Sequence, residues 1–159
     1  MSRKRILYPS RKKIIGVFFG GLIFFVVGIL WARSFIFRQC VEHVDHSPTH
    51  SHTQLKIIQE GREIEIPPSI GLTQDCMHPL HTHDATGLIH MEYPYPVPFF
   101  LGDFFDVMGT TFNNSQIGAI RTFDGYKIIL KKNGKQVTSP YRWILLKDLD
   151  KIEIQVLKE

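Results

Sequence analysis

The longest uncharged run in the chain extends from Ile14 to Ala32, and it limits what the chain can fold into more than any other feature. Its 19 residues are IIGVFFGGLIFFVVGILWA, and a helix of about 20 apolar residues spans a bilayer. Six Lys or Arg residues precede the run, whereas only Arg33 and Arg38 follow closely. Because cytoplasmic segments carry the excess of positive charge, the sequence predicts a basic cytoplasmic stub (1–13), a transmembrane anchor (14–32) and an extracytoplasmic remainder.

A cleaved signal peptide is the main alternative to an uncleaved anchor. The apolar run is longer than a typical signal-peptide core, no A-x-A cleavage site follows it, and no convincing lipobox precedes Cys40. Gly16 and Gly20 form a G-x-x-x-G pair, which joins some transmembrane helices but is more often incidental in a lone helix. We therefore expect a signal-anchor whose single helix attaches the protein to the cell membrane.

The net charge of +4 comes from the N-terminal part of the chain. Residues 1–38 hold eight Lys or Arg and no Asp or Glu, which leaves 11 of the 19 basic residues and all 15 acidic residues for 39–159. No basic face is expected on the part that folds, so nucleic acid is not an expected partner. A chain of 159 residues has room for one domain, and its many aromatic and aliphatic residues argue against disorder throughout.

Residues 33–53 are predicted to be a polar, histidine-rich linker. Four of the eight histidines lie there, namely His43, His46, His50 and His52. Short histidine-rich tracts gather metal loosely in some proteins, and the simpler interpretation is a soluble tether. Cys40 in this linker and Cys76 further on are the two cysteines. Outside the cytoplasm they can form a disulfide, but Cys76 can instead ligate a metal as a thiolate, and the sequence leaves both possibilities open.

Residues 54–159 are predicted to form a small β-rich α+β domain. The runs LKIIQ and REIEI surround Glu60-Gly61, and YKIILKKNGKQV contains Asn133-Gly134, which favours a two-residue hairpin turn. Near the C-terminus, the apolar residues Ile152, Ile154 and Val156 alternate with Glu153, Gln155 and Leu157, as in a strand with one buried face. The best helix candidate is LGDFFDVMG (Leu101–Gly109), whose apolar residues fall at i, i+3, i+4 and i+7.

The stretch from Cys76 to Glu92, CMHPLHTHDATGLIHME, holds four histidines. If Asp84 to Gly87 is a turn, a hairpin places His81 directly opposite His90. Alternate residues on a strand share a face, and so do directly opposite residues, so His81, His83 and His90 converge on one patch. Neutral imidazole suits zinc, copper, nickel or iron. The inference depends on the register, because a slip of one residue moves His90 to the other face.

Several neighbours of this triad are secondary ligand candidates. They are Cys76, His78, Asp84 and Glu92. Glu92 shares the face of His90 in the expected register, Asp84 can orient an imidazole through a hydrogen bond, and Met91 is discounted because it faces the other way. In the structural alternative, Asp84 closes an Asx-turn, Gly87 supplies a positive φ, and the histidines are hydrogen-bonded structural residues. No C-x-x-C pair or H-E-x-x-H helix is present.

Two resemblances bear on the architecture. LHTHDATGLIHME (Leu80 to Glu92), followed by FFLGDFFDVMG (Phe99 to Gly109), resembles the motifs LHTHDxTGxIHxE and LGxFFxxxG of an uncharacterised family of membrane-anchored, extracytoplasmic prokaryotic proteins. This resemblance covers most of residues 54–159 and implies a location and an architecture, but no activity. The order hairpin, helix, hairpin and the ending LKDLDKIEIQV are similar to small β-grasp domains, which implies a sheet wrapped on one helix. The extra histidine hairpin departs from a minimal β-grasp, and a small β-sandwich of cupredoxin type is the alternative.

The sequence supports three functions of different classes. The first is a copper- or zinc-binding module centred on His81, His83 and His90; a His-carboxylate set indicates zinc, and a soft Cys/Met/His set indicates copper. The second is a module that contacts another envelope protein and in which the histidine cluster is structural. The third is a metal-dependent hydrolase in which Glu92 or Asp84 activates a metal-bound water. No nucleophile elbow or phosphate-binding loop is present, so we assign no catalytic residue and expect metal binding.

Overall fold

The computed structural model describes residues 39–41 and 50–159, together with Phe25, Val27 and Gly28. The chain divides into two compact units, Met1–Ile36 and Phe37–Glu159. The predicted cytoplasmic stub lies outside the described residues, and so does the predicted anchor except for those three positions. Within the part of the chain that the structure describes, no helix is both long enough and apolar enough to cross a membrane.

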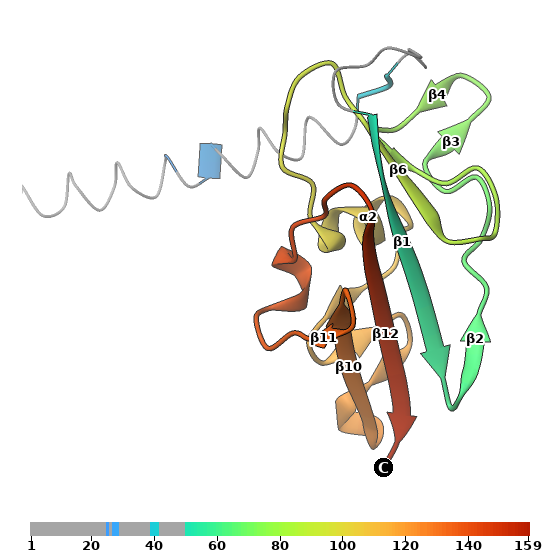
Figure 1. Cartoon of the computed structure of the whole chain (residues 1–159), viewed down its shortest axis with the longest axis vertical. Helices are drawn as coiled ribbons and strands as arrows, with labels where there is room; N and C mark the ends of the chain where they lie inside the picture. The colour runs from blue at the N-terminus through green and yellow to red at the C-terminus, as the bar shows by residue number, and fades with distance from the viewer. Residues whose placement is uncertain (1–24, 26, 29–38, 42–49) are drawn as a thin grey trace, which may run out of the picture. The chain divides into compact units, whose positions relative to one another are not determined.

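One seven-stranded sheet organises the described part of the second unit (Figure 1). Its strands are β1 (His50–Gln59), β2 (Arg62–Ile64), β5 (Leu80–His81), β6 (Leu88–Glu92), β10 (Tyr126–Lys132), β11 (Lys135–Gln136) and β12 (Asp150–Lys158). The order across the sheet is β11-β10-β12-β1-β6-β5, and β2 pairs with the end of β1 beyond β6. The central pair, β1 and β12, is parallel, whereas the other neighbours are antiparallel.

Shorter elements connect these strands. They are the hairpin of β3 (Leu72–Thr73) and β4 (Cys76–Met77), the helix α2 (Leu101–Val107), the small sheet of β7 (Phe112–Asn113), β8 (Gln116–Ile117) and β9 (Ile120–Arg121), and the 3-10 turns η1 (Thr122–Asp124) and η2 (Tyr141–Trp143). The helix begins with a capping hydrogen bond, in which the Phe100 N–H donates to the Asp103 carboxylate over 2.7 Å. The predicted helix is therefore confirmed.

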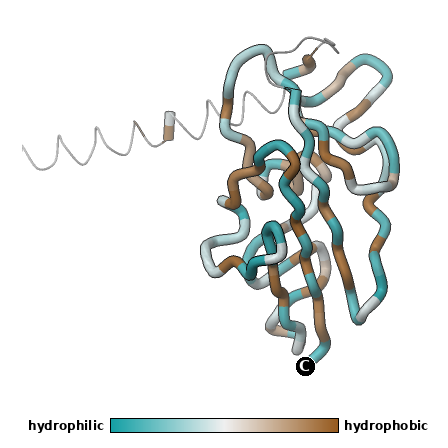
Figure 2. Tube along the Cα trace, in the orientation of Figure 1, coloured by the Kyte–Doolittle hydropathy of each residue, from teal (hydrophilic) through white to brown (hydrophobic). Residues whose placement is uncertain are grey.

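The core lies against one face of the main sheet, because the long strands alternate buried side chains with more exposed ones. Figure 2 shows the matching alternation of hydrophobic and hydrophilic residues along the chain. The buried face is formed by Leu55, Ile57, Ile89, Met91, Ile128, Leu130, Ile152, Ile154 and Val156. Helix α2 adds Leu101, Phe104 and Phe105, and the ring of Phe105 stacks on that of Phe112 with centroids 4.1 Å apart. Each fully buried side chain of this kind stabilises the fold by about 1.5–3 kcal/mol.

Both predicted hairpin turns are confirmed. Glu60 and Gly61 have φ values of 50° and 77°, and Asn133 and Gly134 have φ values of 51° and 78°. A type I′ turn requires a positive φ at both central residues, which is why these pairs favour it. The expectation of a small β-rich α+β domain is confirmed as well.

The start of the domain differs from the prediction. Strand β1 begins at His50, so the last four residues assigned to the linker belong to the sheet. The linker residues 33–38 and 42–49 lie outside the described residues. As a result, two histidines of the expected tether, His50 and His52, are held in a central strand.

Candidate metal centre

The pairing of β5 with β6 has the predicted register. His81 lies opposite His90, and Leu80 lies opposite Met91. The ladder ends at His81, so the two further pairs that a hairpin with this register and a turn at 84–87 would add, Thr82 with Ile89 and His83 with Leu88, do not form. On its other side, β6 pairs with β1 along its whole length.

Asp84 closes the turn between the two strands, as the structural alternative expected. Its Oδ1 accepts hydrogen bonds from the Thr86 N–H over 2.9 Å and from the Thr86 hydroxyl over 2.5 Å. These hydrogen bonds from Thr86 lower the pKa of the Asp84 carboxyl. Gly87 ends the turn with a φ of 77°. Within the described residues, Asp84 therefore holds the loop and does not orient an imidazole.

The predicted triad comes together. One ring nitrogen from each of His81, His83 and His90 lies within 4.8 Å of the others. The rings of His81 and His90 stack with centroids 5.2 Å apart, and the ring of His83 meets both of them edge-on. His81 is fully buried, whereas His83 is exposed.

The ring of His81 is fixed by a backbone carbonyl. Its Nδ1 lies 2.9 Å from the carbonyl oxygen of His78. A carbonyl oxygen only accepts, so Nδ1 carries the proton and donates it. In the neutral ring, the lone pair is then on Nε2, which lies 3.8 Å from Oε1 of Glu92. A backbone acceptor on the far nitrogen is the usual support of a metal-bound histidine.

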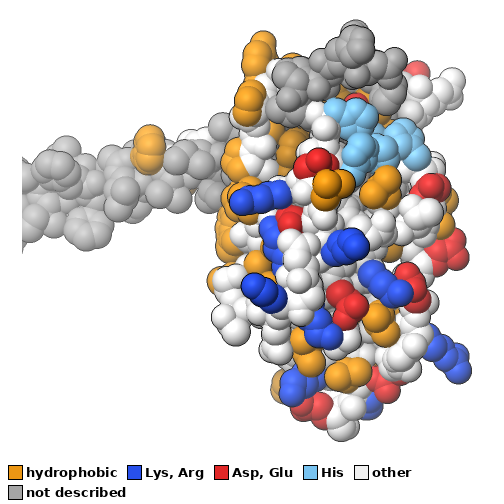
Figure 3. All heavy atoms as spheres, viewed as in Figure 1, with side chains coloured by type: hydrophobic (Ala, Val, Ile, Leu, Met, Phe, Trp, Pro, Cys, Tyr) orange, Lys and Arg blue, Asp and Glu red, His pale blue; other side chains and the backbone are white. Residues whose placement is uncertain are grey.

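Strand β1 adds a second group of histidines to the same face. His52 lies opposite His90 across the ladder, and His50 lies opposite Glu92. The ligand nitrogens of His50, His52 and His90 also lie within 4.8 Å of one another, so His90 belongs to both groups. The histidine side chains gather in one patch (Figure 3). In β1, His50 and His52 lie on the face opposite to the buried Thr53, Leu55 and Ile57. Sequence reasoning missed these two histidines because the segment 50–53 is polar.

Glu92 joins the two groups. Its carboxylate is 1% exposed, and its Oε1 lies 3.2 Å from Nε2 of His50, 3.8 Å from Nε2 of His81 and 3.9 Å from Nδ1 of His90. A buried carboxylate is costly unless positive charge lies close to it. The Glu92 oxygen therefore provides negative charge at the point where imidazoles from three strands meet.

His90 lies at the centre of the patch and is held neutral. The pKa of His90 is lowered to about 4, mainly by burial and also by the neighbouring His52, His83 and His50, against the opposing effect of Asp84. Among the described residues, no hydrogen-bond partner reaches its buried Nδ1. A neutral imidazole with an available lone pair is the form that ligates a metal.

Comparisons with protein families, with curated proteins and with solved structures find no match for the chain.

Two of the secondary candidates are not ligands in this arrangement, and Met91 lies elsewhere as predicted. Cys76 forms a disulfide with Cys40, with their Cα atoms 5.0 Å apart, so it offers no thiolate. The imidazole of His78 belongs to neither group of ligand nitrogens, although its carbonyl supports His81. Met91 is buried on the core face of the sheet, which leaves imidazole and carboxylate as the donors in the patch.

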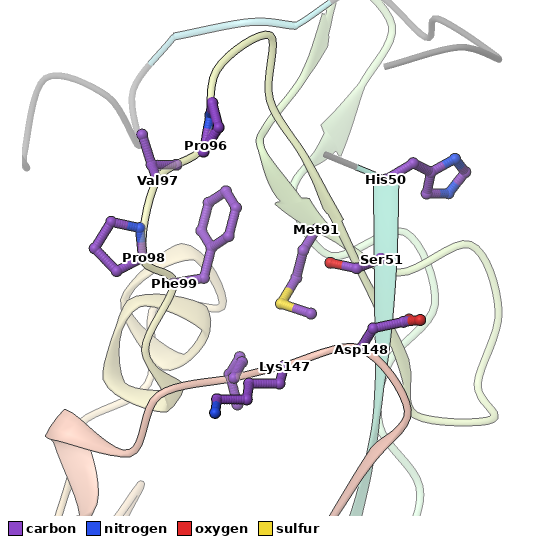
Figure 4. Close-up of a pocket in the computed structure, with 10 residues that line it drawn as sticks. His50, Ser51, Met91, Pro96, Val97, Pro98, Phe99, Lys147 and Asp148 are labelled. Carbon is purple, nitrogen blue, oxygen red and sulfur yellow. The ribbon is translucent and has the colours of Figure 1, made fainter. Parts of the chain in front are cut away.

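A pocket of about 610 Å³ adjoins the start of β1 on the core side (Figure 4). It is lined by His50, Ser51, Met91, Pro96, Val97, Pro98, Phe99, Leu146, Lys147 and Asp148. The ring of His50 points away from this space, whereas the side chains of Met91 and Phe99 border it. Of the histidines in the two groups, His50 is the one among the residues that line the pocket.

Proposed function

We propose that the chain is a membrane-anchored, extracytoplasmic metal-binding module that holds a zinc(II) ion with His81, His83 and His90. The observation that carries the proposal is the convergence of one ring nitrogen from each of these three imidazoles within 4.8 Å, with the buried carboxylate of Glu92 beside His81 and His90. Zinc sites are built from such donors, with nitrogen at about 2.0–2.1 Å from the ion. Tetrahedral ligands at that distance are about 3.4 Å apart, so the three ring nitrogens, now within 4.8 Å of one another, would move closer together on binding zinc.

The donor set favours zinc over copper. A soft set with thiolate or thioether would select copper(I), but Cys76 is in a disulfide and Met91 lies on the other face of the sheet. Imidazole and carboxylate remain, and they suit zinc(II). Copper(II) is the runner-up, because a nitrogen-rich site generally binds it more tightly than zinc in the absence of geometric selection.

The disulfide supports the proposed location. Disulfides persist in oxidising compartments and are rare in the cytoplasm. In a protein anchored at 14–32 with its C-terminal part outside the cytoplasm, both cysteines lie in such an oxidising compartment. The distribution of basic residues around the apolar run predicts the same orientation.

For the fold, we propose a β-grasp type. The strand order β2-β1-β12-β10-β11, with a parallel central pair and a helix after the first hairpin, supports it over a β-sandwich. The histidine hairpin is then an insertion between β2 and α2 that extends the sheet on one side.

Zinc titration of the purified full-length chain tests the proposal, with a competing chromophoric chelator and elemental analysis after dialysis. We expect one zinc per chain, and we expect His83→Ala to weaken zinc binding at least about 100-fold, because even the outer supports of a ligand contribute 10–100-fold. His78→Ala is the matched control and is expected to keep wild-type affinity, because the substitution retains the backbone carbonyl that holds His81. The proposal is wrong if the dialysed protein holds less than a tenth of an equivalent of any transition metal and binds none on titration.

In that case, a double variant (His81→Ala with His83→Ala) that still binds an envelope protein would favour the envelope-interaction module.

A further inference from the structure

We propose that the two histidine groups are two stations for one metal ion, which moves between them by ligand exchange on His90. This inference rests on the proposed function. The first group, His81, His83 and His90, is called the fixed station; the second, His50, His52 and His90, is called the open station. Zinc enters and leaves through the open station and is retained in the fixed station.

The two stations differ in how firmly their ligands are held. Each station contains one exposed histidine, which is His83 in the fixed station, but the fixed station also contains His81, which is fully buried and whose Nδ1 donates to the carbonyl of His78. In the open station, the side chain of His50 is 28% exposed, at the first residue of β1. A ligand that is already oriented loses less freedom on binding, so the fixed station holds the ion more tightly and the open station exchanges it faster.

The shared residues make transfer possible without release to solvent. The ring of His90 lies 4.5 Å from those of both His52 and His83, so it touches one ligand of each station. Oε1 of Glu92 lies close to His50 of the open station and to His81 of the fixed station. An ion that keeps His90 and Glu92 can therefore exchange the β1 imidazoles for His81 and His83 one at a time.

The charge of the patch favours one ion over two. Among the described residues, the buried carboxylate of Glu92 is the single anion that contacts both stations, and the more distant Asp84 is committed to its turn. Two divalent ions joined through one imidazole would place four positive charges against this carboxylate in a partly buried site, where like charges repel strongly.

Zinc loading and chelator-driven release of the full-length chain, followed by stopped flow, test the two-station exchange. For His52→Ala, we expect both rates to fall by the same factor of about ten while the dissociation constant stays within about threefold, because the open station is a path and not the resting site. For His83→Ala, we expect the dissociation constant to rise at least about 100-fold, with weak binding left at the open station. His78→Ala again serves as the control, and His52→Gln and His83→Gln repeat the test if an alanine variant does not fold.

Three results overturn the inference. If His52→Ala loads and releases zinc at the wild-type rates, the open station is not used. A raised dissociation constant in this variant, with an unchanged loading rate, means that His52 is an ordinary ligand. Saturation at two zinc ions per chain means that the stations are separate sites. If the wild-type chain binds no zinc at all, the proposed function fails too, which distinguishes that case from the other three.

Discussion

At the residue scale, both groups of candidate metal ligands depend on His90. It is the one histidine common to both groups, and its ring is close to those of His50, His52, His81 and His83. Burial is the main reason that its pKa lies near 4. The same environment that disfavours a proton on His90 leaves its lone pair available to a metal ion at neutral pH.

The pKa of His90 predicts how stability depends on pH. Unfolded His90 takes up a proton near pH 6.5, whereas folded His90 does so near pH 4. Between these values the unfolded chain binds the extra proton, so the metal-free protein loses stability as the pH falls, on the order of 2 kcal/mol by pH 5. Above pH 6.5 the residue has no effect.

Zinc-loaded protein should lose more over the same range, because protons compete with the ion for every imidazole in the site. Thermal melts of zinc-loaded and chelated protein from pH 7 to 5 measure both losses. The expected result is a zinc-dependent increase in Tm that shrinks steeply as the pH falls. Parallel curves for the two forms would mean that the histidines do not form a metal site.

Glu92→Gln separates the metal site from the fold. Glutamine has the shape of glutamate but no charge, and burying a neutral amide costs less than burying a carboxylate. We expect the metal-free variant to keep its melting temperature or to melt higher, while zinc binding weakens by about 10–100-fold. Melting with and without zinc measures both effects. A variant that loses metal-free stability and keeps zinc affinity would assign Glu92 a purely structural role.

At the element scale, the start of β1 shows what the sequence could not predict. The segment from His50 to Thr53 is polar and follows a histidine-rich tract, so it was assigned to the linker. In the structure, the His52 N–H donates to Asp148 over 2.9 Å, and the His52 carbonyl accepts from the Leu149 N–H over 2.7 Å. The Thr53 hydroxyl also donates to the Lys147 carbonyl. These partners lie about a hundred residues further along the chain, where local periodicity gives no information.

The hairpin between β5 and β6 was predicted more successfully, because its determinants are local. Asp84 and Gly87 set the turn, and the turn sets the opposition of His81 and His90. The ladder nevertheless ends two pairs earlier than expected, because neither Thr82–Ile89 nor His83–Leu88 forms. Leu88 and Ile89 pair only on the other side of β6, with β1.

Gly87 is predicted to be essential for the position of this hairpin. An alanine Cβ there would lie 2.2 Å from the carbonyl oxygen of Leu55, and φ is already 77°. Gly134 has nearly the same φ, 78°, with nothing within 4 Å of such a Cβ, and is the matched control. We expect Gly134→Ala to cost about 1–2 kcal/mol, the usual penalty for a left-handed conformation, and Gly87→Ala to cost more and also to weaken zinc binding. Chemical denaturation and zinc titration of both variants measure this, and equal losses of stability would contradict the close packing.

At the scale of the whole molecule, the sequence predicted the class of fold but not the arrangement that builds the site. Alternation of Ile152, Ile154 and Val156 predicted a half-buried strand, yet nothing local indicated that this strand lies parallel to β1 in the centre of the sheet. That pairing places β1 between β12 and β6, and thereby places His50 and His52 beside His90. The second group of ligands is therefore a product of long-range topology.

The disulfide should stabilise both the fold and the site. Cys40 and Cys76 are 36 residues apart, and closing a loop of that length stabilises a protein by about 4 kcal/mol in the chain-entropy model. Cys76 lies in β4, two residues before the carbonyl that holds His81. We expect Cys40→Ser with Cys76→Ser to lower the melting temperature and to weaken zinc binding.

Melting and zinc titration of this double variant, beside wild type with and without reductant, provide the comparison. Reduced wild type should behave as the double variant does. If neither reduction nor the double substitution changes stability or zinc affinity, the disulfide is not part of the support of the site.

X-ray absorption at the zinc edge, on the zinc-loaded full-length chain, tests the central claim most directly because it counts the ligands and their types. The account predicts three imidazole nitrogens and a carboxylate or water oxygen at about 2.0–2.1 Å, in tetrahedral geometry. In the presence of a competing chelator, His83→Ala should retain far less zinc than wild type, because only the weaker open station is left, and His78→Ala should match the wild-type spectrum. A spectrum with oxygen ligands and no imidazole signal, or full zinc occupancy in His83→Ala under the same competition, would contradict a zinc site built on His81, His83 and His90.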